Sequence, residues 1–340
     1  MTDSTPELRF IPLSADDDDT AGQWLQLMAE AADDVPGSAP PCPVDMIGSL
    51  RFAPPATALE DWVALRDGQV VGALRIGLPN GAPVARVDQL LVHPKLRRRG
   101  IGRALFGRAL ELAAEHGRTT LAGMTVEALE GGPARDPAPS AFVAALGGAR
   151  ADGPSGLHQW LDLRGHDPLA DGVPALPEGY SLVRWGTVTP DAYAVPVSLL
   201  EQSLGDTGAE PEPDQEVETS YARAFETMRV GRGRRAYHTG VVHEASGTLA
   251  GYTSVSKTTG NPEYALQGMT VVHRGHRGHR LGLLLKLSNL ENVLRQEPAV
   301  RLLETANAED NHSMIAVNSA MGFVPQDRWV SWTFGVGSSD

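Results

Sequence analysis

The sequence predicts an α/β protein that contains two copies of one fold. The first observation behind this prediction is a β-prone run, a basic turn with glycines and an apolar helix, which follow one another in residues 86–105. The second is that the pattern returns, because residues 269–282 align with residues 89–102 without a gap. An offset of 180 residues (269 − 89) in a chain of 340 residues makes the repeat domain-sized.

The first copy of the pattern has the features of a diphosphate-binding turn. Its strand ends before Pro94, which has no N–H to give to a β-ladder. Three arginines and two glycines follow before the helix. The free N–H groups and the dipole of a helix start attract an anion, and glycine lets the backbone come close to it. The alternative is a basic turn that caps an ordinary helix. A dinucleotide-binding turn fits less well, since its third glycine would stand at Leu105.

The series Arg97-x-x-Gly100-x-Gly102 resembles the acetyl-coenzyme A (acetyl-CoA) loop of the GCN5-related N-acetyltransferases (GNAT family), whose signature is Gln/Arg-x-x-Gly-x-Gly/Ala. The resemblance implies that each copy is an α+β domain with a mixed, mostly antiparallel sheet flanked by helices. It also implies acetyl-CoA as cofactor. The expected coenzyme-binding residues of the first copy are Leu91, Val92, Arg97, Arg98, Arg99, Gly100, Ile101, Gly102 and Arg103.

The second copy departs from the signature at one position. It reads Arg277-x-x-Arg280-x-Gly282, with arginine in place of the first glycine. A side chain at Arg280 would narrow the approach of the backbone to the phosphates, and its guanidinium offers a bidentate contact that partly offsets this. The expected coenzyme-binding residues of this copy are Val272, Arg277, Gly278, His279, Arg280, Leu281, Gly282 and Asn311.

The repeat divides the chain into an N-terminal domain (1–165), a proline-rich linker (166–178) and a C-terminal domain (179–340). Within the first domain, Asp67-Gly68 predicts the turn of a β-hairpin. Residues 37–55, rich in proline and glycine, predict an irregular arm over the substrate side. Residues 157–163 predict the last strand of this domain.

Neither copy has the usual general acid of the family. In GNAT proteins a tyrosine four residues before a closing Gly-Phe protonates the leaving thiolate. The corresponding positions here hold Val143 and Asn318. The second copy nevertheless keeps Asn311 and the ending Gly322-Phe323, and it resembles a two-domain subgroup that is common in actinomycetes, with a layout similar to that of mycothiol synthase.

The attacking amine of an acetyl transfer must lose a proton, which requires a carboxylate or an ordered water near the loop strand. Asp88 is the best candidate in the first copy, because it stands on that strand. A solvated aspartate at the strand edge is an equally good interpretation. In the second copy Glu304 and His243 are weaker candidates.

Composition limits the partners. Lys+Arg 29 and Asp+Glu 42 give a net charge of −13, which argues against nucleic acid and is compatible with cationic substrates such as amines. One cysteine, Cys42, leaves no intrachain disulfide.

Histidines 273, 276 and 279 stand among arginines that would repel a cation, so we expect no metal. No apolar run reaches the length of a membrane span, and we expect a cytoplasmic monomer or homodimer without a membrane partner.

We therefore expect a tandem N-acetyltransferase that transfers an acetyl group from acetyl-CoA to a small-molecule amine, by direct attack on the thioester. The first copy is expected to bind the coenzyme, and the second copy to be degenerate. A second hypothesis is an acyl-CoA-binding protein that has lost its chemistry and has a regulatory or structural role. A third is that the second copy is the catalytic one.

Overall fold

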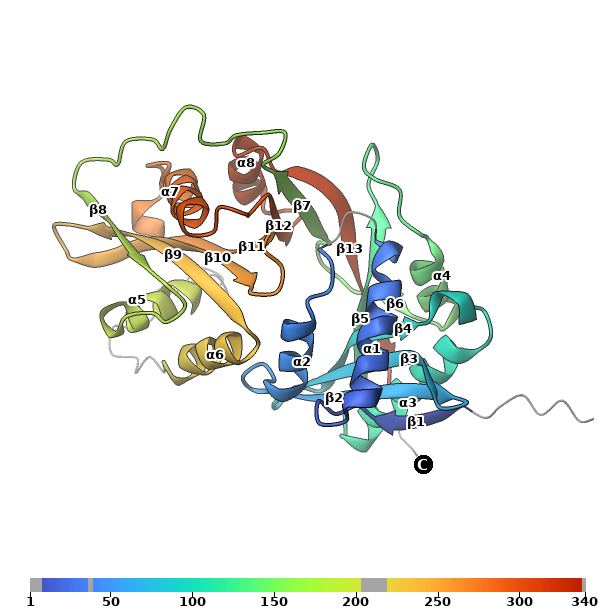
Figure 1. Ribbon diagram of the computed structural model, residues 1–340. Coiled ribbons are helices and arrows are strands. Elements are labelled where there is room, and N and C mark those ends of the chain that lie inside the picture. The colour runs from blue at the N-terminus through green and yellow to red at the C-terminus, as the bar shows by residue number, and fades with distance from the viewer. Residues whose placement is uncertain (1–7, 36–38, 203–218, 338–340) are drawn as a thin grey trace, which may run out of the picture. The chain divides into compact units, whose positions relative to one another are not determined.

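A computed structural model describes residues 8–35, 39–202 and 219–337 of the chain (Figure 1). The chain forms two compact units. The first unit consists of Met1–Leu157 together with Gln326–Asp340, and the second of His158–Pro325. Each unit contains a mostly antiparallel sheet with helices against it, which confirms the predicted fold class.

The sheet of the first unit has the order β1-β2-β3-β4-β5-β13. Strands β4 and β5 are parallel, and the other neighbours are antiparallel. The strands are β1 (Arg9–Pro12), β2 (Thr57–Arg66), β3 (Gln69–Pro79), β4 (Val84–Val92), β5 (Thr120–Ala128), the short β6 (Ala149–Arg150) and β13 (Val324–Gly335). The helices are α1 (Asp18–Glu30), η1 (Ala32–Asp34), α2 (Pro43–Arg51), η2 (Pro94–Leu96), α3 (Ile101–Glu115) and α4 (Ala138–Ala145).

The sheet of the second unit has the order β7-β12-β11-β10-β9-β8, in which β11 and β12 are parallel. The strands are β7 (Gly156–Asp162), β8 (Tyr180–Trp185), β9 (Arg234–His243), β10 (Thr248–Thr258), β11 (Tyr264–Val272) and β12 (Leu302–Ala308). The helices are α5 (Asp191–Gln202), α6 (Ser220–Gly231), η3 (Arg274–His276), α7 (Leu281–Gln296) and α8 (His312–Ala320). Within the described ranges, no helix is both long and apolar enough to cross a membrane.

Two apolar clusters hold the first unit together, one formed by α3 and the other by α1. Successive side chains of a strand point to opposite faces of the sheet. Leu74 of β3 is buried in the cluster that contains Leu105 of α3, whereas its neighbour Ala73 belongs to the cluster of Trp24 on α1. Burial of each large apolar side chain contributes about 1.5 to 3 kcal/mol to folding. In the second unit, α7 has the place of α3 and buries Leu285 and Leu290.

The C-terminal strand belongs to the first unit, which differs from the expected domain limits of 165 and 179. β13 pairs with β5 along the register from Asp327↔Ala128 to Gly335↔Thr120. β7, which the sequence assigns to the first domain as its last strand, lies in the second unit from His158 onward. Both strands are partly apolar, and such a strand can pair with either sheet, so local sequence does not determine which sheet each strand joins.

The segment 37–55 contains a regular helix, and the predicted irregular arm is therefore wrong for its described part, residues 39–55. Helix α2 begins at Pro43, whose fixed φ and missing N–H suit the first position of a helix. Its apolar side chains Met46, Ile47 and Leu50 pack against the core cluster of α1. The predicted hairpin turn is confirmed, since Asp67 and Gly68 have φ values of 52° and 77°.

Candidate functional site

The parallel strands of each unit separate beyond a short paired segment. In the first unit, β4 pairs with β5 only over Val84–Val87, although it continues to Val92. In the second unit, β11 pairs with β12 only over Tyr264–Leu266, although it continues to Val272. Beyond these residues the facing strand edges make no ladder with each other. Some of their carbonyls accept side-chain hydrogen bonds, as that of Gln267 does from Thr305 Oγ1 at 3.2 Å, and the remaining backbone groups can bind a ligand.

Helix α3 begins directly after the separated half of β4. Gly100 is its N-cap, in the left-handed region with φ 84°. The first helical hydrogen bond runs from the Ala104 N–H to the Gly100 carbonyl at 3.0 Å. The N–H groups of residues 101–103 precede it and have no acceptor within the helix. Arg98, Arg99 and Arg103 are exposed around this helix start. The arrangement can hold a diphosphate.

Arg97 is bound within the protein. Its guanidinium donates to both carboxylate oxygens of Asp34, and its Nε donates to the Val92 carbonyl at 3.3 Å. The hydrogen bond to Asp34 raises the pKa of Arg97 above its ordinary value. A second side-chain contact, His93 Nε2 to Glu30 Oε2 at 3.0 Å, joins the same loop to the end of α1. The loop is thus anchored to α1 and η1 by side chains.

A cavity of about 300 Å³ lies along the separated half of β4. Its lining is apolar except for the amide of Gln89, and none of the lining residues carries a charge. Gln89 accepts a hydrogen bond from Trp24 Nε1 at 3.3 Å, which fixes the side chain. The lining residues are Met28, Ala31, Ala32, Val35, Ala39, Pro41, Gln89, Leu90 and Leu91.

Asp88 occupies a β-bulge, since Arg75 pairs with Gln89 and Ile76 pairs with Val87 across it. Its Oδ1 accepts a hydrogen bond from Arg86 Nε at 3.3 Å. Gly77 makes room for the carboxylate, because a Cβ there would lie 2.7 Å from Asp88 Oδ2. Among the described residues, those that line the cavity include its successor Gln89 but not Asp88 itself.

Residues 97–102 and 277–282 are the two loops predicted to bind phosphate, called the phosphate loops below. Their left-handed positions match, with glycine and arginine exchanged. Each loop has two left-handed residues, two positions apart. In the first loop they are Arg98 (φ 61°) and Gly100 (φ 84°), and in the second Gly278 (φ 88°) and Arg280 (φ 57°). Arg280 therefore does not change the path of the backbone. The predicted loop residues of each copy gather at the start of one helix, that of α3 or α7.

The remaining predicted residues of the second unit lie along β12 and α8. Glu304 Oε1 is 3.1 Å from Nε2 of His158, a buried residue of β7. Asn311 caps α8, since its Oδ1 accepts from the Met314 N–H at 3.2 Å. A capping role satisfies this side chain without a ligand.

A buried polar cluster in the second unit was not predicted. Lys286 of α7 is 2% exposed, and its Nζ donates to Asn318 Oδ1. Asn318 Nδ2 in turn donates to Gln159 Oε1 at 2.8 Å. Burial lowers the pKa of Lys286 to about 7. The available signal in the sequence was a lysine inside a run of leucines, Leu283-Leu-Leu-Lys-Leu287.

Histidines of the second loop form an aromatic group with neighbouring strands. His276 Nδ1 lies 2.9 Å from the Tyr180 hydroxyl, and its ring centroid lies 4.9 Å from that of His243. Burial and the neighbouring imidazoles, His243 first, lower the pKa of His276. The described part of the chain contains no group of three or more His, Cys, Asp or Glu side chains that could hold a metal ion.

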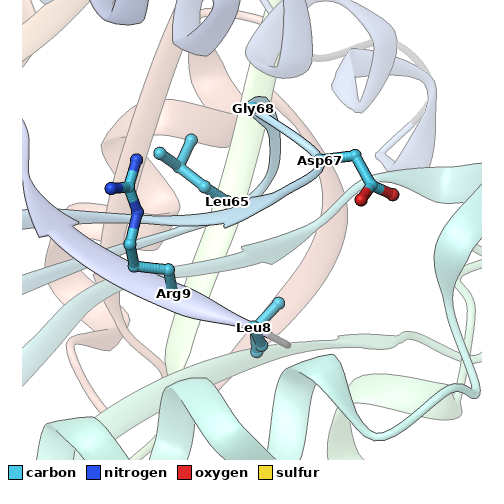
Figure 2. A pocket seen from close by; sticks show the side chains of 5 residues that line it. All are labelled: Leu8, Arg9, Leu65, Asp67 and Gly68. Carbon is cyan, nitrogen blue, oxygen red and sulfur yellow. The ribbon is translucent and has the colours of Figure 1, made fainter. Parts of the chain in front are cut away.

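A second hollow, of about 450 Å³, lies in the first unit at the β2–β3 turn. Figure 2 shows Arg9, the first residue of β1, and the preceding Leu8 beside Leu65, Asp67 and Gly68 of the hairpin. The Arg9 and Asp67 side chains are not directed toward each other. None of the predicted site residues lines it.

Comparisons with known proteins agree with this geometry. A model of the acetyltransferase (GNAT) family matches residues 24–130. A solved structure described as a tandem GNAT protein from the clavulanic acid biosynthesis pathway is 71% identical, with a TM-score of 0.93 over 98% of this chain and 100% of that chain. A GCN5-related N-acetyltransferase from Sphaerobacter thermophilus is 16% identical and shares the fold, with a TM-score of 0.67 over 97% of this chain and 96% of that chain. No curated protein matches. The chain therefore belongs to the GNAT family of acetyltransferases and carries the fold as a tandem.

Proposed function

We propose that this protein is an acetyl-CoA-dependent N-acetyltransferase that acts on the amine of a small molecule. The observation that carries the proposal is the joint placement of two features on β4 of the first unit. The helix start that can hold a diphosphate follows Val92, and the cavity of about 300 Å³ lies along Gln89–Leu91 of the same strand. The helix start would hold the diphosphate of the coenzyme, and the cavity beside the same strand would hold the acceptor.

The residues of this unit fit the coenzyme. The N–H groups of residues 101–103 face the diphosphate, and the exposed side chains of Arg98, Arg99 and Arg103 add positive charge. The separated edge of β4 offers backbone groups to the pantetheine arm. When bound, acetyl-CoA supplies the acyl group as an activated thioester, and backbone N–H groups can polarise its carbonyl.

Asp88 is our candidate for the group that takes the proton from the attacking amine, directly or through a water. Its carboxylate is one third exposed and is held by Arg86 at the bulge, next to the lining residue Gln89. The description of the 71% identical structure, a biosynthetic pathway protein, supports a small-molecule acceptor. The net charge of −13 supports a cationic one.

A second candidate function is acyl-CoA binding without chemistry. Val143 and Asn318 favour it, because neither can protonate a leaving thiolate in the way the tyrosine of the family does.

Two measurements distinguish these functions. The first is a calorimetric titration of acetyl-CoA into the wild type, Gly100→Trp and Gly81→Trp. Gly81 is the matched control, because it also has positive φ and open space around a Cβ, and it precedes β4 at the end away from the loop. We expect Gly100→Trp to lose one binding site and Gly81→Trp to keep it. Retention of that site in Gly100→Trp would contradict the assignment.

The second measurement is mass spectrometry of a panel of small amines incubated with the protein and acetyl-CoA. Acetylation that falls with Gly100→Trp and with Asp88→Asn supports the transferase. Coenzyme binding without acetylation of any amine, at any pH tested, would favour the binding protein instead.

A further inference from the structure

The buried cluster of Lys286, Asn318 and Gln159 has no counterpart in the first unit. At the offset of the repeat, Lys286 corresponds to Phe106 of α3, which packs against Phe334 with 4.7 Å between ring centroids. Counted back four residues from Gly322 and from Gly147, the glycines that close the two corresponding helices, Asn318 corresponds to Val143. The first unit is therefore apolar at both positions, and the second is polar at both. A difference at two paired positions indicates a task that is specific to the second unit.

The cluster stands beside the separated strands of this unit. Asn307, in the half of β12 that does not pair with β11, donates to Gln159 Oε1 at 3.5 Å. Helix α8, which carries Asn318, begins only a few residues later. Asn318 occupies the position of the tyrosine in the family pattern. The cluster thus lies where that pattern places the group that meets the leaving sulfur.

The cluster is rich in hydrogen-bond donors and contains no acid. The described hydrogen-bond partner of Lys286 is a neutral amide, and its Nζ also lies 5.2 Å from the centroid of the Phe323 ring. Gln159 is fully buried, and its Nε2 donates to no described group. On the adjacent strands the Glu304 carboxylate lies 3.1 Å from His158 Nε2, which also accepts a hydrogen bond from Trp160 Nε1 at 2.9 Å. A buried cation with a neutral partner and a spare amide donor form an environment that favours an anion.

We propose that Lys286, held in place by Asn318, supplies the positive charge that stabilises a coenzyme A thiolate in the second unit. The inference rests on the proposed acyl-transfer function and extends it to the second unit. In this proposal Lys286 acts on the thiolate through its charge, and Asn318 is the positioning residue that holds its Nζ. This arrangement would replace the missing tyrosine by electrostatic stabilisation of the leaving group.

The step balances without a further reactant. The lone pair of the amine forms a C–N bond to the acyl carbon, and the C–S bond breaks with its electron pair on sulfur. The surplus proton of the nitrogen passes to a carboxylate or water, and Lys286 retains its own proton. The same charge also acts on the free thiol of bound coenzyme A, which should lose its proton more readily than in water.

This consequence can be measured without knowing the acceptor. The ultraviolet absorbance of the thiolate is followed against pH for coenzyme A bound to full-length Gly100→Trp, in which the first loop is blocked. Lys286→Met and Lys286→Arg are made in that background. Lys257→Met is the matched control, because Lys257 is also buried, at 6% exposure, but its Nζ lies 3.1 Å from the carboxylate of Glu297.

We expect the bound thiol to have a pKa below that of free coenzyme A. Lys286→Met should raise it by roughly one pH unit or more, as loss of a nearby charge in a partly buried site does. Lys286→Arg and Lys257→Met should leave it low. Should Lys286→Met not fold, Lys286→Arg still tests the idea, because a permanent charge keeps the thiol acidic at every pH at which a lysine would lose its proton.

Three results would overturn the inference. The first is a thiol pKa in Gly100→Trp equal to that of free coenzyme A. The second is a thiol pKa that Lys286→Met leaves unchanged. The third is that coenzyme A does not bind to Gly100→Trp at all. Each leaves acetyl transfer at the first unit untouched. Conversely, the protein could acetylate no amine and still lower the pKa of the bound thiol. That combination would contradict the proposed transferase activity and leave the inference about Lys286 standing.

Discussion

Arg97 and Asp34 form a two-point ion pair between the phosphate loop and η1 in the first unit, with both oxygens of the carboxylate engaged. Asp34 closes η1, whose first residue, Ala32, lines the cavity beside β4. The pair therefore links the expected coenzyme site to a wall of the expected acceptor site. In the second unit Arg277 donates to the Val272 carbonyl, as Arg97 does to that of Val92.

Substitution of Asp34 should change coenzyme affinity in the first unit. In Asp34→Asn the guanidinium of Arg97 loses its counter-charge close to the bound phosphates. We expect acetyl-CoA to bind more tightly, on the order of threefold at low ionic strength, with a steeper salt dependence. Calorimetry at two salt concentrations measures this. Asp33→Asn makes the same change of net charge at an exposed neighbour, and an equal effect of both substitutions would contradict a specific role for the pair.

The left-handed residues of the second loop should respond in opposite directions to substitution. A residue with a Cβ pays a conformational cost of roughly 1 to 2 kcal/mol in the left-handed backbone conformation, whereas glycine does not. We expect Arg280→Gly to stabilise the second unit by up to about 1 kcal/mol and Gly278→Ala to destabilise it by about 1 kcal/mol. Urea unfolding measures both. Gly275→Ala, in the same loop but without positive φ, should change stability by less than about 0.5 kcal/mol.

The buried ion pair of Arg135 and Asp327 should be essential to the first unit. Their closest atoms are 2.8 Å apart, and the two side chains are 4% and 0% exposed. Removal of Arg135 takes a cationic partner away from the buried Asp327 carboxylate. We expect Arg135→Leu to destabilise the first unit by about 3 to 5 kcal/mol. Thermal unfolding measures the loss. A change below about 1 kcal/mol would show that the pair does not hold β13 in place.

Lys286 should make the stability of the second unit depend on pH. Its pKa falls from 10.5 to about 7 on folding, so the unfolded chain binds more protons between these values. The free energy of unfolding should therefore rise with pH over this window and be lowest below it. In Lys286→Met this slope should disappear. Urea unfolding at several pH values tests the expectation, and a wild type without the slope would contradict it.

His238 should sensitise the second unit to acid. The buried imidazole stacks on Trp185 at 5.2 Å, and burial lowers its pKa from 6.5 to about 4. The unfolded chain binds the proton first, so stability is full above pH 6.5 and is lost as the pH falls toward 4. His238→Phe retains the stacking and should reduce the acid sensitivity. Unfolding midpoints of variant and wild type, measured between pH 4 and 6.5, test this prediction. An equal loss of stability in both proteins would contradict it.

Local sequence was sufficient to predict the elements that bear the loops. The Asp67-Gly68 turn and the helix starts at Gly100 and Arg280 follow from residue preferences within a few positions. Helix α2 was missed, because its proline and glycine content resembles that of a loop. Its helical form depends on burial of Met46, Ile47 and Leu50 against α1, which is a tertiary contact.

The sequence by itself determined the family, the tandem repeat and the positions of the two strand–turn–helix loops that we predict to bind phosphate. These features depend on contiguous residues with their own backbone requirements. Only the tertiary structure decided that β13 completes the first unit, that Asp34 holds Arg97, and that Lys286 lies against Asn318. These relationships join residues far apart in the chain, and the free energy that selects each partner comes from burial and charge pairing after the chain has folded. No local pattern of residues encodes such a choice.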